Sequence, residues 1–261
     1  MATIAVLSQK GGTGKTTTVR TLTDVFRRVG LSVLAVDLDP QGNLSDYLDV
    51  DPEATPTIGD VLADRATLSE AIHADVVPAS LNLAEAELAL GGKIGRELTL
   101  KRALRSVRDR YDLVLIDCPP SLGLLTVNAL VAADWALLSA EAQYFAMQGV
   151  EQATGVIELA REALNPDLAL LGVILNIADM RTRHSREAFA SLRTHFGEKL
   201  LDTTVRASIA YAESAERAQS IIDYRPDLGV DYLNIADELL RRLTLPGARA
   251  RLADLAAEIA S

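Results

Sequence analysis

A glycine-rich loop lies between an apolar strand and an amphipathic helix near the beginning of the chain. Residues 3–7 form a short apolar run, and residues 15–29 have apolar side chains at helical spacing, with Gly30 placed as a C-terminal cap. The segment around their junction reads Gln9-Lys10-Gly11-Gly12-Thr13-Gly14-Lys15-Thr16-Thr17. Glycines let successive backbone N–H groups curl around phosphate oxygens, and a helix N-terminus adds the positive end of its dipole. The sequence therefore predicts a phosphate-binding loop within a βαβ unit.

The side chains of this loop predict how a nucleotide and a metal ion are held. Lys15 is placed to reach the β- and γ-phosphates, and Thr16 to offer its hydroxyl to Mg2+. The expected cofactor-binding set also includes Gly11, Gly12, Thr13, Gly14 and Thr17. The alternative is an ordinary glycine-rich turn. The strand before the loop, the helix after it and the paired lysines argue against that alternative.

Short apolar runs alternate with longer helical segments along the rest of the chain. We expect further strands at residues 32–36, 113–116, 135–139 and 168–175, and a short one at 76–78. Hydrophobic residues make up 49% of the chain and aromatic residues only 4%, which favours parallel strands covered by helices. The predicted fold class is α/β, a single doubly wound, mostly parallel sheet with helices on both faces. Residues 1–245 are expected to form the domain, and residues 246–261 a C-terminal helix or tail that belongs to it.

Acidic residues follow two of the predicted strands where each strand ends. Asp37 and Asp39 are two residues apart, so in an extended segment both side chains point to one side. Asp117 ends the apolar run 113–116, which is the general form of a Walker B motif. Ligands of open α/β sheets bind at the carboxyl edge, so we expect these carboxylates beside the phosphate loop. The alternative role for each aspartate is a helix cap or a turn.

The second lysine of the loop points to a family. Lys10, with Gln9 where the usual Walker A motif has glycine, is the signature of the deviant Walker A loop, and here the sequence resembles the ParA/MinD family of ATPases. The segments 37–43, which read D-L-D-P-Q-G-N, and 116–121, which read I-D-C-P-P-S, closely resemble the matching segments of that family. The resemblance implies a deviant P-loop NTPase fold with ATP and Mg2+ as cofactors.

The resemblance also implies roles for the charged residues. Lys10 reaches across a dimer interface to the nucleotide of the other subunit, and Asp39 positions the attacking water. Asp37 supports the Mg2+ shell, and Asp117 orders Mg2+ through a water. The expected catalytic residues are therefore Lys10, Lys15 and Asp39, and the expected metal-site residues are Thr16, Asp37 and Asp117. Phosphoryl transfer to water needs positioning and charge neutralisation rather than a covalent nucleophile.

Two residues of the C-terminal half are expected to bind the nucleotide. Asn176 ends the apolar run 168–175, where related ATPases place an asparagine that reads the adenine. The alternative for Asn176 is a simple polar strand end. Arg206 lies in a Val-Arg-Ala segment where the family often has I-P-R. We infer that either the adenine pocket or the basic surface is remodelled there.

Basic residues outnumber acidic ones between residues 181 and 206, although the formal net charge of the chain is −10. The overall charge argues against indiscriminate binding to nucleic acid, so only a local patch can hold DNA. ParA proteins use basic residues in this half to hold duplex DNA without regard to sequence, for which phosphate contacts suffice. The alternative is a solvated helix face. The candidate DNA contacts are Arg181, Arg183, Arg186, Arg193 and Lys199.

The resemblance implies a slow, partner-stimulated ATPase that forms a homodimer on ATP and binds non-specific double-stranded DNA. Such a dimer positions or segregates a plasmid, a chromosome or another large cargo with a ParB-like adaptor. The single cysteine, Cys118, and the absence of a secretory pattern predict a cytoplasmic protein, and the resemblance implies association with the nucleoid. We expect no membrane-spanning helix.

Three other functions occur among ATPases of similar fold. A MinD-like membrane-bound ATPase regulating division placement needs a C-terminal helix rich in Lys and Arg, whereas Arg249 and Arg251 are here mixed with Asp254 and Glu258. A reductase with a bridging iron–sulfur cluster needs two thiolates from each subunit, which one cysteine cannot supply. ATP-dependent ligases of the same superfamily stay open, but the D-x-D-P-Q-G-N segment favours the partition branch.

Overall fold

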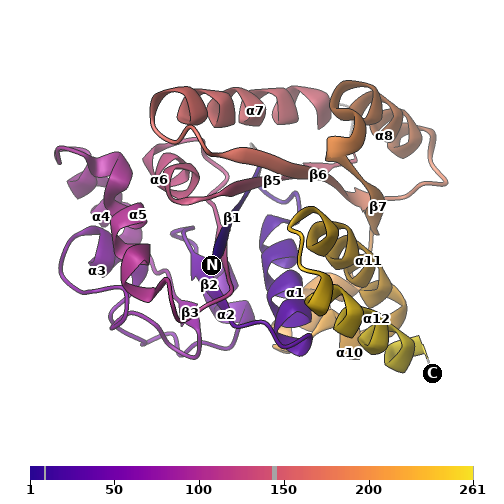
Figure 1. The fold of residues 1–261 in the computed structure, drawn as a ribbon, viewed down its shortest axis with the longest axis horizontal. Helices are drawn as coiled ribbons and strands as arrows, with labels where there is room; N and C mark the ends of the chain where they lie inside the picture. Colours follow the sequence, from indigo (N-terminus) through magenta and orange to yellow (C-terminus); the bar gives the residue numbers. More distant parts are fainter. Residues whose placement is uncertain (9, 143–145, 261) are drawn as a thin grey trace.

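A seven-stranded sheet organises the chain, and every pairing between its strands is parallel (Figure 1). The computed structural model describes residues 1–8, 10–142 and 146–260. Side by side, the strands are β3 (Val76–Val77), β2 (Val33–Asp37), β4 (Leu113–Asp117), β1 (Ala2–Leu7), β5 (Trp135–Glu141), β6 (Ala169–Ala178) and β7 (Leu200–Arg206). This arrangement confirms the predicted fold class.

Helices cover both faces of the sheet, and a separate hydrophobic cluster fills the space on each face. The first face carries α3 (Ile58–Leu62), α4 (Asn82–Leu90), α5 (Thr99–Leu104), α6 (Leu124–Ala132), α7 (Ala146–Ala163) and α8 (Arg183–Phe196). The second carries α1 (Lys15–Arg28), α2 (Asn43–Tyr47), α9 (Ala210–Glu216), α10 (Ile221–Tyr224), α11 (Pro226–Arg242) and α12 (Pro246–Ala260). Single 3₁₀ turns lie at Arg96–Leu98, Arg105–Val107 and Gly197–Lys199.

The central strands are apolar because both of their faces are covered. In β1, Ala5 and Leu7 pack into one cluster while Ile4 and Val6 pack into the other, as the alternation of side chains along a strand requires. All five residues of β4 are buried. Parallel strands enclosed by helices lack a solvent face, so they read as continuous apolar runs. This is why β1, β2, β4, β5 and β6 were found in the sequence to within a few residues.

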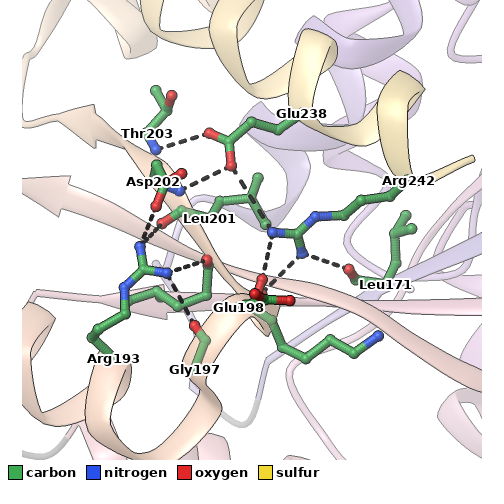
Figure 2. Close-up of polar contacts among 11 residues, drawn as sticks. Leu171, Arg193, Gly197, Glu198, Leu201, Asp202, Thr203, Glu238 and Arg242 are labelled. Carbon is green, nitrogen blue, oxygen red and sulfur yellow. Dashed lines mark hydrogen bonds and ion pairs between the residues drawn. The ribbon is translucent and has the colours of Figure 1, made fainter. Parts of the chain in front are cut away.

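Strand β7 was not predicted, because its sequence mixes buried, half-buried and exposed positions and includes polar residues. Contacts from α8 and α11 hold it at the edge of the sheet (Figure 2). The Glu238 carboxylate accepts the backbone N–H groups of Asp202 and Thr203, each at 2.9 Å.

Two arginines also bind the backbone in and around β7. Arg193 donates to the carbonyls of Gly197, Leu200 and Leu201. Arg242 donates to the carbonyls of Leu171, Glu198 and Lys199. The strand therefore depends on side chains from distant segments.

The C-terminal helix α12 lies against the body of the chain beside α11 (Figure 1). Leu252 is buried in the second cluster, and Leu255 and Ile259 pack partly against it. The three residues share one face of α12. Among the described residues, no helix combines the length and the apolar character that crossing a membrane requires.

Candidate active site

The carboxyl ends of β1, β2 and β4 meet at one edge of the sheet. The register pairs Val6 of β1 with Asp117 of β4, and Asp37 of β2 with the same Asp117. The glycine-rich loop follows β1 directly, so it lies beside both aspartates. Segments separated by more than one hundred residues in the sequence therefore form one site at this edge.

The loop has the backbone conformation that its glycines predict. Gly12 and Gly14 have φ angles of 78° and 82°, in the left-handed region that side chains with a Cβ rarely adopt. Gly14 is the N-cap of α1, and its carbonyl accepts the Thr18 N–H at 2.9 Å. Lys15 begins the helix and is 6% exposed. The position of Gln9, which marks the departure from the usual motif, lies outside the described residues.

Asp117 and Thr16 form the part of the site that suits a metal ion. The Thr16 hydroxyl donates to Asp117 Oδ2 at 2.6 Å. Among the described residues, the other oxygen of this carboxylate, Oδ1, is buried and accepts no hydrogen bond. Mg2+ takes oxygen ligands and keeps several of its waters, so a buried carboxylate oxygen that still lacks a donor fits a hydrated Mg2+ ion. The oxygen atoms present therefore fit the predicted cofactor, and Thr16 and Asp117 are the residues that would hold it.

Asp37 is fully buried and already holds three donors. Its Oδ1 accepts the Asp39 N–H at 3.1 Å, and its Oδ2 accepts the N–H and the hydroxyl of Ser45 at 2.9 and 2.8 Å. Burial raises the pKa of Asp37, and the hydrogen bonds from Ser45 oppose that shift. Burial also raises the pKa of Asp117, the nearby Asp37 charge raises it further, and Thr16 and Lys15 lower it. Asp37 thus fixes the loop after β2 as well as adding negative charge beside Asp117.

Asp39 lies in the turn beyond β2 and not on an extension of the strand. The strand ends at Asp37, so the alternation expected for Asp37 and Asp39 stops there. Asp39 is half-buried, and its Oδ1 accepts the Gln41 N–H at 3.0 Å. Gly42, with a φ of 68°, then caps α2. The turn places a partly solvent-accessible carboxylate at the same sheet edge as the phosphate loop.

A cleft of about 340 Å³ runs from the phosphate loop along α1. Residues from the loop, from the ends of β6 and β7, and from α9 and α11 line it. Its lining includes most of the predicted cofactor-binding residues, namely Gly12, Gly14, Lys15, Thr16, Thr17, Asn176 and Arg206. The structure therefore brings Asn176 and Arg206 into one cleft with the phosphate loop.

Arg206 lines this cleft and is held in place by contacts to α11. Its backbone N–H and its Nε both donate to the Asp231 carboxylate, at 3.0 and 2.9 Å for Oδ2. A proline, which the family often has here, lacks that N–H. The backbone donor that this replacement creates is thus bound by Asp231, which is 8% exposed. Neither Asp231 nor the cleft residue Tyr211 was identified from the sequence, because neither belongs to a motif.

Lys10 and Lys15 have opposite environments although both belong to the loop. The Lys10 side chain is 65% exposed and its Nζ lies 3.2 Å from Glu141 Oε2 at the end of β5. Lys15 is buried inside the site. Glu141 is a further residue that sequence reasoning missed, although its place at a strand end on the ligand edge was a usable signal.

The candidate DNA contacts divide into two groups. Arg181, Arg183 and Arg186 lie around the start of α8, and all three are exposed. Arg181 pairs with Asp179, and Arg183 pairs with Glu187. Arg193 lies near the other end of α8 and is bonded to the carbonyls before and within β7 (Figure 2). Lys199 is exposed in the turn that follows.

A parallel α/β sheet with a glycine-rich loop after its central strand, and an acidic residue ending the neighbouring strand, defines a P-loop nucleoside triphosphatase. Comparison with known proteins narrows this class. A family model described as an AAA domain matches residues 1–170. The sporulation initiation inhibitor protein Soj of Bacillus subtilis is 38% identical over 245 residues, covering 90% of this chain and 97% of Soj.

Two further comparisons agree with that match. The chromosome partitioning protein ParA of Myxococcus xanthus is 36% identical over 259 residues, covering 96% of this chain and 92% of that protein. A structure of cobyrinic acid a,c-diamide synthase from Mycobacterium smegmatis with bound ADP and magnesium is 34% identical, with a TM-score of 0.82 over 94% of this chain and 96% of that one. The chain belongs to the ParA/Soj family of partitioning ATPases, which confirms the family that the sequence motifs predicted.

Proposed function

We propose that this protein is an ATP-dependent dimerising switch that binds DNA without sequence preference and positions a plasmid, chromosome or other large cargo with a ParB-like adaptor. The contrast between the two loop lysines is the observation on which the proposal depends. Lys15 is buried in its own site, whereas Lys10 is mostly exposed and directed to Glu141. A lysine exposed at the rim of the site is suited to contact the phosphates of a second subunit.

Different residues of the site have different roles in ATP hydrolysis. Lys15 and the loop backbone bind the phosphates, while Thr16 and Asp117 hold the site for Mg2+. When bound, Mg2+ neutralises charge that develops on the phosphate oxygens. Asp39, half-buried in its turn, orients the attacking water. A second subunit's Lys10 adds positive charge only in the dimer, so hydrolysis follows dimerisation.

The exposed arginines at the start of α8 support the DNA part of the proposal. Arg181 and Arg183 have 91% and 83% of their side-chain surface exposed, so phosphates can reach both guanidinium groups. Their carboxylate partners, Asp179 and Glu187, have 36% and 57% of their side-chain surface exposed, so solvent and salt weaken both ion pairs. Phosphates can therefore displace them. Two copies of this small patch in one dimer bind DNA more strongly than one copy does.

The experiment is binding of a labelled non-specific duplex at increasing salt concentration, in ATP or ADP, for the wild type and Lys10→Ala. We expect binding that requires ATP, weakens with salt and is lost in the variant. Dimerisation on ATP is measured in parallel by sedimentation. ATP-dependent dimers that bind no duplex at low salt would refute the DNA assignment while leaving the switch in place.

The membrane alternative has less support from the fold. Leu252, Leu255 and Ile259 of α12 pack against the second cluster, so the apolar side chains described for this helix face the protein and not a bilayer. Cys118 is fully buried and burial raises the pKa of its thiol, so it does not supply a reactive thiolate for the amide chemistry in the name of the synthase relative.

A further inference from the structure

We propose that Ser139 and Thr18 fix the orientation of the Asn176 amide and thereby make the site prefer adenine over guanine nucleotides. This inference rests on the proposed contact between Asn176 and the base. It adds two residues to that contact, neither of which touches the base itself. Both are positioning residues.

Asn176 lies close behind the phosphate loop, in a buried and polar environment. It is 1% exposed at the end of β6 and lines the cleft. Its Nδ2 lies 2.6 Å from Ser139 Oγ on β5 and 3.3 Å from Thr18 Oγ1 on α1. A Cβ added at Gly14 would lie 3.3 Å from Nδ2, so the amide packs directly against the loop.

The two hydroxyl groups leave the amide only one satisfactory orientation. Ser139 donates its hydrogen to the Thr13 carbonyl at 2.7 Å, and Thr18 donates its hydrogen to the Gly14 carbonyl at 2.8 Å. A hydroxyl has a single hydrogen, so both oxygens can only accept from Asn176. An amide turned the other way would place its oxygen against two oxygens that have no hydrogen left to donate. The NH2 group of Asn176 must therefore face Ser139 and Thr18.

This orientation leaves the amide oxygen without a donor. Among the described residues, Asn176 Oδ1 is buried and accepts no hydrogen bond. A buried acceptor that lacks a partner is costly, so the site gains when a ligand supplies a donor. Adenine carries an exocyclic amine at position 6, whereas guanine carries a carbonyl oxygen there. The fixed amide oxygen therefore pairs with adenine and repels guanine.

Tyr232 of α11 makes a further contact to Thr18 that favours the same orientation of the amide. It is completely buried, and its hydroxyl lies 3.2 Å from Thr18 Oγ1. Since Thr18 gives its hydrogen to Gly14, Tyr232 is the donor in this pair. Thr18 thus receives two hydrogen bonds, one from Tyr232 and one from Asn176, and this keeps its own hydrogen on the loop carbonyl.

The experiment measures the affinities of ADP and GDP, with Mg2+, for the wild type, Asn176→Ala, Ser139→Ala and Thr18→Val. Titration calorimetry gives both affinities for each protein. We expect Ser139→Ala to reduce the ratio of ADP affinity to GDP affinity about tenfold, because the amide can then turn over. Thr18→Val is expected to reduce the ratio by a smaller factor, since its contact is longer. Asn176→Ala should weaken ADP binding without improving GDP binding.

Thr21→Val is the matched control. Thr21 lies on the same helix and donates to the Thr17 carbonyl at 2.7 Å, whereas the Asn176 amide donates to Thr18 and Ser139. A loss of general stability weakens both nucleotides equally and leaves their ratio unchanged. Thermal melting of each nucleotide-free variant identifies any protein that fails to fold, and Thr18→Val then stands in for Ser139→Ala.

The outcomes separate this inference from the contact on which it rests. If Asn176→Ala binds ADP as tightly as the wild type, the base contact is wrong and the inference fails with it. If Asn176→Ala weakens ADP binding while Ser139→Ala and Thr18→Val keep the wild-type ratio, the contact stands and the positioning role of the two hydroxyls is refuted. A reduced ratio in these two variants, with Thr21→Val unchanged, supports the inference.

Discussion

The phosphate-loop edge and the α8–β7 region both concentrate charged residues, but they use them differently. At the loop edge, Lys15, Asp37 and Asp117 come from separate segments, and within the described part of the chain one oxygen of Asp117 still lacks a donor. In the α8–β7 region, residues 183–206, Arg193 is bonded to backbone carbonyls. Arg242 of α11 is bonded to carbonyls of the same region and of β6, and the two arginines hold the edge strand (Figure 2). Groups in the first region can still bind a ligand, whereas many charged side chains in the second are already bonded to the protein itself.

This difference shows why charge clusters in a sequence need a structural test. A motif that combines a backbone conformation with charged side chains predicts a ligand site, because the fold leaves part of the bonding capacity of those groups unused. A count of arginines predicts only that positive charge is present. The predictions below test whether the two regions are as different as their contacts indicate.

The largest effect is expected from Asp39→Ala. Loss of the carboxylate that orients water should reduce ATP hydrolysis by about 100-fold or more, because positioned general bases contribute on that scale. ATP affinity should change little, since Asp39 lies beyond the loop. Steady-state hydrolysis and ATP titration measure the two quantities. Asp46→Ala, an exposed acid on α2, is the control, and equal losses in both variants would contradict the role of Asp39.

Removal of the buried lysine is expected to come next in size. Lys15→Ala should weaken ATP binding about 100-fold, because hydrogen bonds to charged groups contribute about 1.5–3 kcal/mol. Calorimetry with a slowly hydrolysed ATP analogue measures the affinity. Lys101→Ala on α5 changes the charge by the same amount away from the loop edge. An unchanged affinity in Lys15→Ala would mean that the loop edge does not hold the phosphates.

Two arginines of the α8–β7 region should behave in opposite ways. Arg193→Ala should reduce the free energy of unfolding by about 2 kcal/mol, because several carbonyls lose their donor, and leave the salt dependence of DNA binding unchanged. Arg183→Ala should keep the stability but lower the salt slope by about 1 for each contact removed. Urea unfolding and duplex titration at several salt concentrations measure these effects. Similar profiles in both variants would remove the distinction between structural and exposed arginines.

The smallest effect is expected at the contact between Lys10 and Glu141. Glu141→Gln weakens the attraction that holds Lys10 on its own chain, so the ATP-bound dimer should form at a concentration up to about fivefold lower. Sedimentation equilibrium with an ATP analogue measures this change. Glu151→Gln, an exposed residue of α7, is the control. Weaker dimerisation in Glu141→Gln would show that Glu141 presents Lys10 to the partner instead of competing with it.

The sequence predicted those parts of the protein whose structure depends on residues that are close together in the chain. The loop from Lys10 to Thr17 and the acid Asp117 follow apolar runs directly, so the fold class and the phosphate site were apparent. The catalytic, base-contact and DNA-contact roles still await experiment. Strand β7 was missed because its register depends on Glu238 and Arg242 of α11, some forty residues away.

The hydroxyl groups around Asn176 were missed for a related reason. Ser139, Thr18 and Tyr232 are common residue types on three different elements, and only the folded chain brings them together. Asp231 was not predicted for the same reason, because it belongs to no motif and only the fold brings it to the Arg206 N–H. Glu141 and Ser139 had one usable signal, since both lie near the carboxyl end of a predicted strand.

The acidic residues of α11 also limit how two copies of this chain can assemble. Open sheets often associate by adding strands at an unpaired edge, which produces continuous intermolecular sheets and fibres. Here carboxylates of α11 occupy the backbone N–H groups of Asp202, Thr203 and Arg206 along β7. The outer edge is thus closed to strand addition by a helix of the same chain. Association of two copies through β7, and the growth of such a sheet into a fibre, is therefore disfavoured.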